Sequence, residues 1–176
     1  MPQFAVTAIG QDRPGIVAAV SGALLEVDGN VEDSQMSILR GHFAVMLVVE
    51  APDGIEQAEL AERLGRVRDE LGLEAMTVSP VGAGAQPVRP SHVVSVYGAD
   101  SKGIVHGISA ALAGLGVDIT DLETKLAGTP DSPVYVMILE IALGGATVGE
   151  VEAALRDAAG TLGVEVSLRE LNGEAL

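Results

Sequence analysis

Apolar residues recur along this chain in two periods, one of two residues and one of about 3.6 residues. In the first half, an alternating stretch leads into a helical one. Two alternating stretches, a second helical stretch and a last alternating stretch follow. The pattern predicts strands at 4–10, 31–39, 43–50 and 73–81 and helices at about 14–27 and 55–71. This order is that of a ferredoxin-like βαββαβ unit, an antiparallel sheet with both helices on one face.

The second half repeats the same order. Its predicted strands lie at 91–97, 117–126, 134–142 and 164–171, its helices at 103–115 and 147–162, and a longer hairpin at 128–133. The first helices correspond through Ile16, Val20, Leu24 and Val27 against Ile104, Ile108, Leu112 and Leu115. The second helices correspond through Leu60, Leu64, Val67 and Leu71 against Val151, Leu155, Ala158 and Leu162. We therefore predict two α+β domains, at 1–81 and 91–176, joined by a Gly/Pro-rich linker at 82–90.

Both second strands break their alternation near the start, between Val31 and Met36 in one copy and between Ile119 and Thr124 in the other. An extra residue at the same place in each copy would cause such a break. A shared β-bulge is therefore predicted.

The strand at 43–50 is apolar on both of its faces. If Phe43 and its alternates face the helices, then Ala44, Met46 and Val48 point outward beside Ile9. An outer sheet face of this kind is expected to be covered by the other repeat or by another chain.

Composition excludes several functional classes. The formal net charge is −15, which argues against direct binding of nucleic acid or of an anionic membrane surface. The absence of cysteine excludes disulfides, thiol catalysis and thiolate metal sites. No signal peptide or membrane-spanning run is recognisable, so a cytoplasmic location is expected.

The turn before the first helix carries candidate binding chemistry. Backbone N–H groups at a helix start favour an anionic group, and Gly15 would let a ligand approach closely. Asp12, a candidate N-cap residue, could receive an ammonium group, and Asn30 could donate or accept from the far side of a groove. Together these groups suit an amino acid. Plainer interpretations stay open, since Asp12 could only cap the helix, Gly15 only allow tight packing, and Asn30 only form a turn.

Other chemistry finds little support in the sequence. His42, His92 and His106 lack the spacing of metal ligands, and no nucleophile with a general base is recognisable. Three other types of the same fold fit poorly. An acylphosphatase needs an arginine in a phosphate-binding glycine loop, whereas the first turn here offers Asp12 before its Arg13. An RNA-recognition domain needs aromatic residues on the central strands and a basic face, and a copper chaperone needs a pair of cysteines on the first turn. Neither an enzyme activity nor a cofactor or metal is therefore expected.

The stretch from Asp12 to Val17, the Gly29-Asn30-Val31 segment and the hairpin from Arg40 to Phe43 together resemble an ACT domain. The resemblance covers residues 4–81 and, in a more divergent copy, 91–171. The two copies in tandem resemble the glycine cleavage system transcriptional repressor group. The resemblance implies a regulatory module that pairs with other ACT domains, often edge to edge, and holds an amino acid between them. The implied ligand-binding residues are Asp12, Arg13, Pro14, Gly15, Ile16, Val17 and Asn30.

The second copy departs from this pattern. Ser101 and Lys102 replace Arg13 and Pro14, and Asp118 stands where Asn30 does. A carboxylate there would repel the carboxylate of a ligand unless it contacts an ammonium group instead. A weaker second site is therefore predicted at Asp100, Ser101, Lys102, Gly103, Ile104, Val105 and Asp118.

Two functional hypotheses follow. In the first, the chain senses an amino acid such as glycine or serine at an ACT–ACT interface and modulates a regulatory protein partner, for instance in transcription. That implies a homodimer or higher homo-oligomer and allosteric control by the ligand. In the alternative, the chain is a ligand-free interaction scaffold. Binding of an amino acid distinguishes the two hypotheses.

Overall fold

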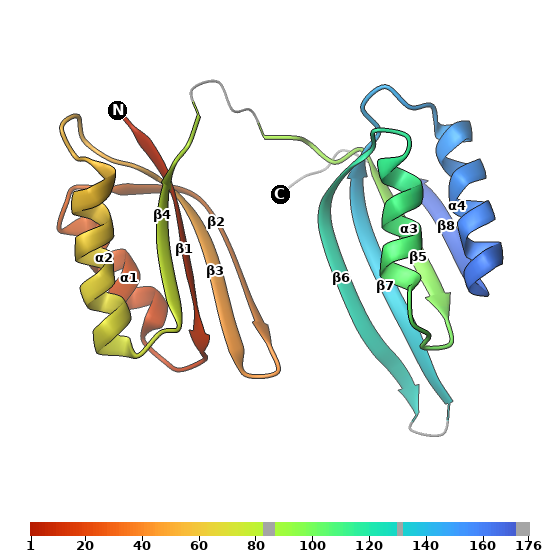
Figure 1. Ribbon diagram of the computed structural model, residues 1–176, viewed down its shortest axis with the longest axis horizontal. Coiled ribbons are helices and arrows are strands. Elements are labelled where there is room, and N and C mark those ends of the chain that lie inside the picture. The colour runs from red at the N-terminus through yellow and green to blue at the C-terminus, as the bar shows by residue number, and fades with distance from the viewer. Residues whose placement is uncertain (83–86, 130–131, 172–176) are drawn as a thin grey trace. The chain divides into compact units, whose positions relative to one another are not determined.

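The computed structural model describes residues 1–82, 87–129 and 132–171. The chain divides into two compact units, Met1–Ala85 and Gln86–Leu176. Each unit is a four-stranded antiparallel sheet with two helices on one face, which confirms the predicted α+β, βαββαβ fold (Figure 1). Residues 83–86 of the predicted linker and 130–131 of the predicted hairpin lie outside the described residues.

Unit 1 has the sheet order β2-β3-β1-β4, so that the first and third strands are central. Its elements are β1 (Gln3–Gln11), α1 (Ile16–Leu25), β2 (Asn30–Leu39), β3 (His42–Glu50), α2 (Gln57–Leu71) and β4 (Ala75–Pro80). Unit 2 has the equivalent order β6-β7-β5-β8. Its elements are β5 (His92–Gly98), α3 (Ile104–Ala113), β6 (Asp118–Thr129), β7 (Ser132–Ala142), α4 (Val148–Leu162) and β8 (Val164–Glu170).

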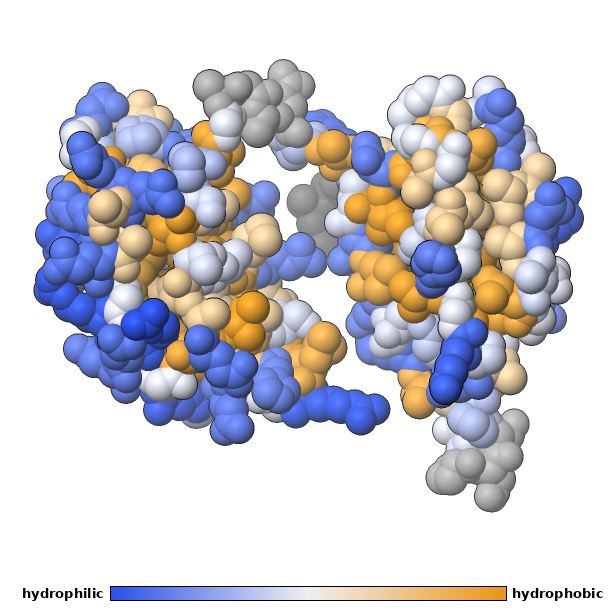
Figure 2. All heavy atoms as spheres, viewed as in Figure 1, coloured by the Kyte–Doolittle hydropathy of each residue, from blue (hydrophilic) through white to orange (hydrophobic). Residues whose placement is uncertain are grey.

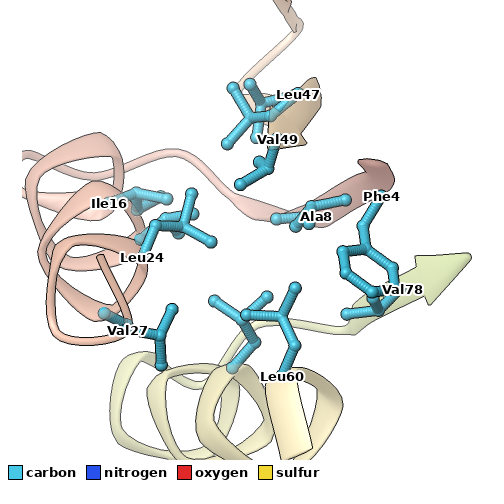
Figure 3. Close-up of a cluster of buried hydrophobic side chains, with 14 of the residues drawn as sticks. Phe4, Ala8, Ile16, Leu24, Val27, Leu47, Val49, Leu60 and Val78 are labelled. Carbon is cyan, nitrogen blue, oxygen red and sulfur yellow. The ribbon is translucent and has the colours of Figure 1, made fainter. Parts of the chain in front are cut away.

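The core of each unit lies between the sheet and its helices. In unit 1, alternate residues of β1 and β3 meet apolar residues of α1 and α2 (Figure 3). The predicted helical positions Ile16, Val20, Leu24, Leu60 and Leu64 are all at most 1 % exposed. Their equivalents in unit 2 are buried to a similar degree. The apolar pattern that the sequence repeats therefore corresponds to a core that is built twice.

A β-bulge interrupts the pairing of β2 with β3 between Val31 and Asp33. The same irregularity separates Ile119 from Asp121 in the pairing of β6 with β7. The predicted shared bulge is confirmed.

The outer strands of both sheets leave apolar side chains exposed. All ten residues of β2 are exposed, including Met36 and Ile38, whose partners Val45 and Phe43 are buried on the helix side. In unit 2, Leu122 and Leu126 of β6 are likewise exposed. Apolar side chains thus reach the surface of each unit among polar ones (Figure 2). An edge strand with exposed apolar side chains among polar ones can pair with another strand along its outer side.

The sheet face of unit 1 that points away from the helices also carries exposed apolar residues. Ile9 is 44 % and Met46 is 55 % exposed, and both point away from the helices, as the alternation of 43–50 predicted.

The burial of the core gives a test of the packing. Leu64→Ala removes a fully buried side chain, so unfolding should become easier by about 2–5 kcal/mol. The matched change Leu25→Ala, at a position 72 % exposed, should alter stability by less than about 0.5 kcal/mol. Urea unfolding followed by circular dichroism at the helix band measures both. Equal effects of the two changes would contradict the assigned core.

A capping box begins α4. The Thr147 side chain accepts from the Glu150 N–H, and the Glu150 carboxylate accepts from the Thr147 backbone N–H and hydroxyl. These hydrogen bonds from Thr147 lower the pKa of Glu150 from its ordinary value of 4.5. The box therefore stabilises unit 2 above that value, and this contribution is lost as the pH falls through the lowered pKa.

The pH dependence of this box can be measured as the melting-temperature difference between wild type and Glu150→Ala. The difference should be largest near neutral pH and should shrink as the pH falls below 4.5. A difference that stays constant across this range would show that the carboxylate charge contributes nothing.

Candidate ligand-binding site

The turn between β1 and α1 is built around a glycine. Gly15 precedes the helix with φ 96° and ψ −9°, in the left-handed region, and no side chain caps the helix start. The assignment of Asp12 as N-cap is therefore wrong, because the helix begins at Ile16, three residues later than that assignment requires. Asp12 instead donates its backbone N–H to the Gly41 carbonyl at 2.8 Å, and its carboxylate is left exposed.

The need for glycine at this turn comes from the backbone angle. A Cβ added at Gly15 would meet no atom within 4 Å, so neither tight packing nor close approach within the unit explains the glycine. A positive φ of this size is disfavoured for residues with a Cβ. Gly103 repeats the geometry before α3, with φ 96° and ψ −4°. Both units thus enter their first helix through the same left-handed glycine.

The positive N-terminal end of α1 is not neutralised by any side chain of the helix start. Its first turn holds no acidic residue and its N–H groups have no side-chain cap, so the positive end of the helix dipole is not compensated locally. Asp12, Arg13 and Pro14 are exposed around it, and Val17 is 50 % exposed, whereas Ile16 is buried in the core. Five of the six predicted turn residues are therefore accessible to a ligand, and the sixth, Ile16, packs in the core beneath the helix.

The hairpin between β2 and β3 lies against this turn, and the sequence pattern did not predict that contact. Arg40 and Gly41 have φ 51° and 84°, the positive angles of a two-residue hairpin turn. The bond from Asp12 to Gly41 joins the two turns. His42 pairs with Gln11 across the sheet, and its Nδ1 lies 3.8 Å from Glu74 Oε1. The length and position of this hairpin were readable in the sequence, but its bond to Asp12 was not.

Unpaired cations gather at this end of unit 1. Three arginines of α2, Arg63, Arg66 and Arg68, form ion pairs with neighbouring carboxylates. Within the described residues, Arg13 and Arg40 form none, and both belong to the two joined turns. The exposed groups at this end are therefore uncapped N–H donors, a free carboxylate and free guanidinium groups, which suit a zwitterion.

Asn30 lies at the other end of the sheet. It is the first residue of β2 and pairs with Glu50, which in turn pairs with Gln3 at the start of β1. The turn follows Gln11 at the far end of β1, and that strand rises about 26 Å at 3.3 Å per residue. Unit 1 alone does not bring Asn30 and the Asp12–Val17 turn together.

Unit 2 places its weaker candidate residues in the same way. Asp100, Ser101, Lys102 and Gly103 form an exposed turn before α3, Ile104 is 2 % exposed, and Val105 is 39 % exposed. Asp118 begins β6 opposite Ala142, at the sheet end away from the turn. In unit 2, as in unit 1, the candidate residues therefore lie at two opposite ends of the sheet.

In the part of the chain that the structure describes, no three side chains of His, Cys, Asp or Glu gather as a metal site. No helix in the described ranges is long and apolar enough to cross a membrane.

Comparison with known proteins gives one family and relatives that match either one unit or the whole chain. The sequence profile of the ACT domain matches residues 3–78 and 92–169. A UPF0237 protein of Methanopyrus kandleri is 38% identical over 77 residues, which are 43% of this chain and 86% of that protein. A phosphoserine phosphatase of Streptomyces coelicolor is 28% identical over 171 residues, which are 96% of this chain but only 40% of that enzyme.

Two solved structures share the fold along the whole chain. A protein of unknown function from Galdieria sulphuraria has a TM-score of 0.83 at 29% identity, covering 97% of this chain and 98% of its own. A candidate glycine cleavage system transcriptional repressor has a TM-score of 0.69 at 16% identity, covering 97% of each chain. The tandem arrangement of two such units therefore occurs in other proteins.

The turn geometry predicts opposite effects for two glycines. Gly15→Val should destabilise unit 1 by about 1–2 kcal/mol, because a β-branched residue must adopt a left-handed conformation. Gly22→Ala, inside α1 with open space around its Cβ, should be neutral or stabilising by up to about 1 kcal/mol. Thermal unfolding of the two variants compares them. Equal stability of Gly15→Val and wild type would contradict the strained backbone at Gly15.

Proposed function

Because this chain belongs to the ACT-domain family, we propose that it is a regulatory protein that binds an amino acid and modulates a protein partner. Glycine and serine are the ligands we favour, since a small zwitterion suits the compact turn. The proposal includes a transcriptional partner, by analogy with the whole-chain fold of the candidate glycine cleavage repressor. Direct contact with nucleic acid is not part of it, in keeping with the net charge of −15. A cytoplasmic location stays a prediction.

The observation that carries the proposal is the uncapped start of α1. The free N–H groups behind Gly15 favour a carboxylate, and the exposed Asp12 carboxylate on the same turn favours an ammonium group. Arg13 and Arg40 add unpaired positive charge beside the carboxylate position. Both charges of an amino acid therefore find an opposite charge here.

The position of Asn30 determines how the site is completed. Since Asn30 lies at the end of the sheet opposite the turn, it can contact a ligand there only from a second domain. Two copies of the exposed β2 edge, paired antiparallel about a two-fold axis, place the start of one strand beside the end of the other. Asn30 of one copy then reaches the sheet end that carries the other copy's turn. We therefore favour a homodimer through β2 with the ligand across the interface.

A bridging ligand of this kind supplies a regulatory mechanism. The ligand binds more tightly when the two domains are paired than when they are apart, so it increases the population of the paired form. A partner protein that binds only one of these forms then responds to the amino acid.

We propose that the chain itself is not an enzyme. The ACT profile accounts for residues 3–78 and 92–169. The phosphatase relative is matched over 40% of its length, so most of that enzyme has no counterpart here.

The alternative function is a ligand-free scaffold. The exposed apolar residues of β2 and of the outer sheet face, Met36, Ile38, Ile9 and Met46, favour it, because they predict association whether or not a ligand binds. The two functions differ in their response to amino acids.

A thermal-shift screen of the purified protein against the twenty amino acids tests the sensor. One amino acid should raise the melting temperature, and a hundredfold excess over the dissociation constant adds about 2.7 kcal/mol of stability. Asn30→Ala and Gly15→Val should each remove this response, the first without a loss of stability in the absence of ligand. Gly22→Ala is the control that should keep the response.

A flat screen at millimolar concentrations would reject the sensor in favour of the scaffold. A response that survives both Asn30→Ala and Gly15→Val would reject the site but keep the sensor.

A further inference from the structure

The two units differ at the outer edge opposite β2 and β6. In unit 1, this edge is β4, and Gln57 Nε2 donates to the Val78 carbonyl oxygen at 2.8 Å. Pro80, which has no N–H, ends the strand. A side chain and a proline thus block β4 against pairing with another strand.

The equivalent edge of unit 2, β8, lacks this block. α2 and α4 both have fifteen residues, so Val148 stands where Gln57 does, and it has no donor. Val78 pairs with Val6 and Leu168 pairs with Val94, so Leu168 is the counterpart of Val78. The Leu168 carbonyl therefore lacks the partner that Val78 has, and Glu170 stands where Pro80 does. Among the described residues, no strand pairs with the outer edge of β8, so its backbone can pair with an added strand.

A groove runs beside this open edge. It lies between α4 and β8, has a volume of about 300 Å³, and is lined by Glu152, Leu155, Arg156, Val166, Ser167 and Leu168. Val166 and Leu168 are half-buried on the helix side of β8, and Leu155 forms the apolar floor. An extended peptide can add as a further strand where an edge strand lies next to a helix, and the groove between β8 and α4 offers both apolar and charged side chains to such a peptide.

The charged residues of the groove indicate which side chains an occupant should carry. Glu152 and Arg156 have the same i,i+4 spacing as Glu59–Arg63 and Glu62–Arg66 of α2, which form ion pairs at 3.2 and 2.6 Å. Among the described residues, Glu152 and Arg156 form no such pair, although both line the groove. Unit 1 has Ala61 and Gly65 at these two positions, so the charges belong to unit 2 alone.

The spacing of these charges matches a strand. Four residues of helix rise about 6 Å, and two residues of a strand rise about 6.6–6.8 Å and point to the same face. One basic and one acidic side chain, two residues apart on an added strand, would therefore face Glu152 and Arg156.

From the open edge, the groove and its unpaired charges, we infer that β8 and α4 dock an extended segment of a partner protein. The segment pairs with β8 as a fifth strand. It places alternate apolar side chains against Leu155, Val166 and Leu168, and a basic and an acidic residue, two apart, against Glu152 and Arg156. The docking does not depend on an amino acid at the β1–α1 turn, so it can hold or fail independently of the sensor.

A designed peptide tests this docking on the full chain. The probes are fluorescein-labelled peptides in which threonine alternates with Val, Lys, Asp and Val, made in both orders of Lys and Asp. A control peptide carries Gln and Asn in their place. One charged peptide should bind about tenfold more tightly than the control by fluorescence anisotropy. The backbone amide resonances of β8 should shift in a ¹⁵N-labelled protein.

Three variants locate the interaction. Arg156→Ala should abolish the preference for the charged peptide. Val148→Gln copies Gln57 of unit 1 and should weaken binding of both peptides by blocking the edge. Arg169→Ala, on the same strand but on the sheet face away from the groove, is the control that should change nothing.

Several results would overturn the inference. These are no binding at about 1 mM peptide, resonance shifts confined to β2 or β6, and an unchanged preference in Arg156→Ala. If the β8 amides respond to protein concentration without any peptide, the occupant is a second copy of the chain and the inferred partner segment is wrong.

Discussion

The left-handed turn at Gly15 is the constraint on which the candidate site depends. Because φ is 96° there, the chain turns from β1 into α1 without a side-chain cap, and the first N–H groups of the helix remain free. A cap at Asp12 would have satisfied one of those donors and placed the carboxylate against the helix. The backbone angle instead leaves the helix donors without a cap and the Asp12 carboxylate exposed on the same turn, and the bond from Asp12 to Gly41 holds the turn against the neighbouring hairpin.

The topology of the sheet sets the second condition. In a βαββαβ unit, α1 carries the chain back along β1, so that β2 starts where β1 starts and ends where β1 ends. A residue at the beginning of β2 therefore lies a full strand length from the turn after β1. The strand that carries Asn30 is an edge strand with exposed apolar side chains, and within the described residues no strand pairs with its outer side. The features that favour association are therefore also those that would complete a site.

Sequence periodicity was sufficient for the fold, because each core position repeats with the period of its element and does so twice. Even the shared bulge was readable, since a one-residue break in alternation has few other causes.

The site was less predictable. Asp12 has the chemistry of an N-cap, but the choice between Asp12 and Gly15 depends on backbone angles that no side-chain pattern records. The separation of Asn30 from the turn followed from strand order rather than from residue type. The contact with Gly41 joins segments that are distant in sequence. The difference between the β4 and β8 edges required the pairing registers, which identify Val78 and Leu168 as equivalents.

The proposed dimer holds the ligand between the turn of one copy and Asn30 of the other. A mixture of Gly15→Val and Asn30→Ala, two variants that should each fail to bind alone, tests this shared site. Binding of the amino acid found in the screen is measured on the mixture by titration calorimetry. In a mixed dimer, the intact turn of one copy meets the intact Asn30 of the other. An equal mixture should then recover about one quarter of the wild-type binding sites with wild-type affinity. If subunits are shown to exchange and no binding is recovered, the two residues do not share a ligand across copies, and the proposed interface is wrong.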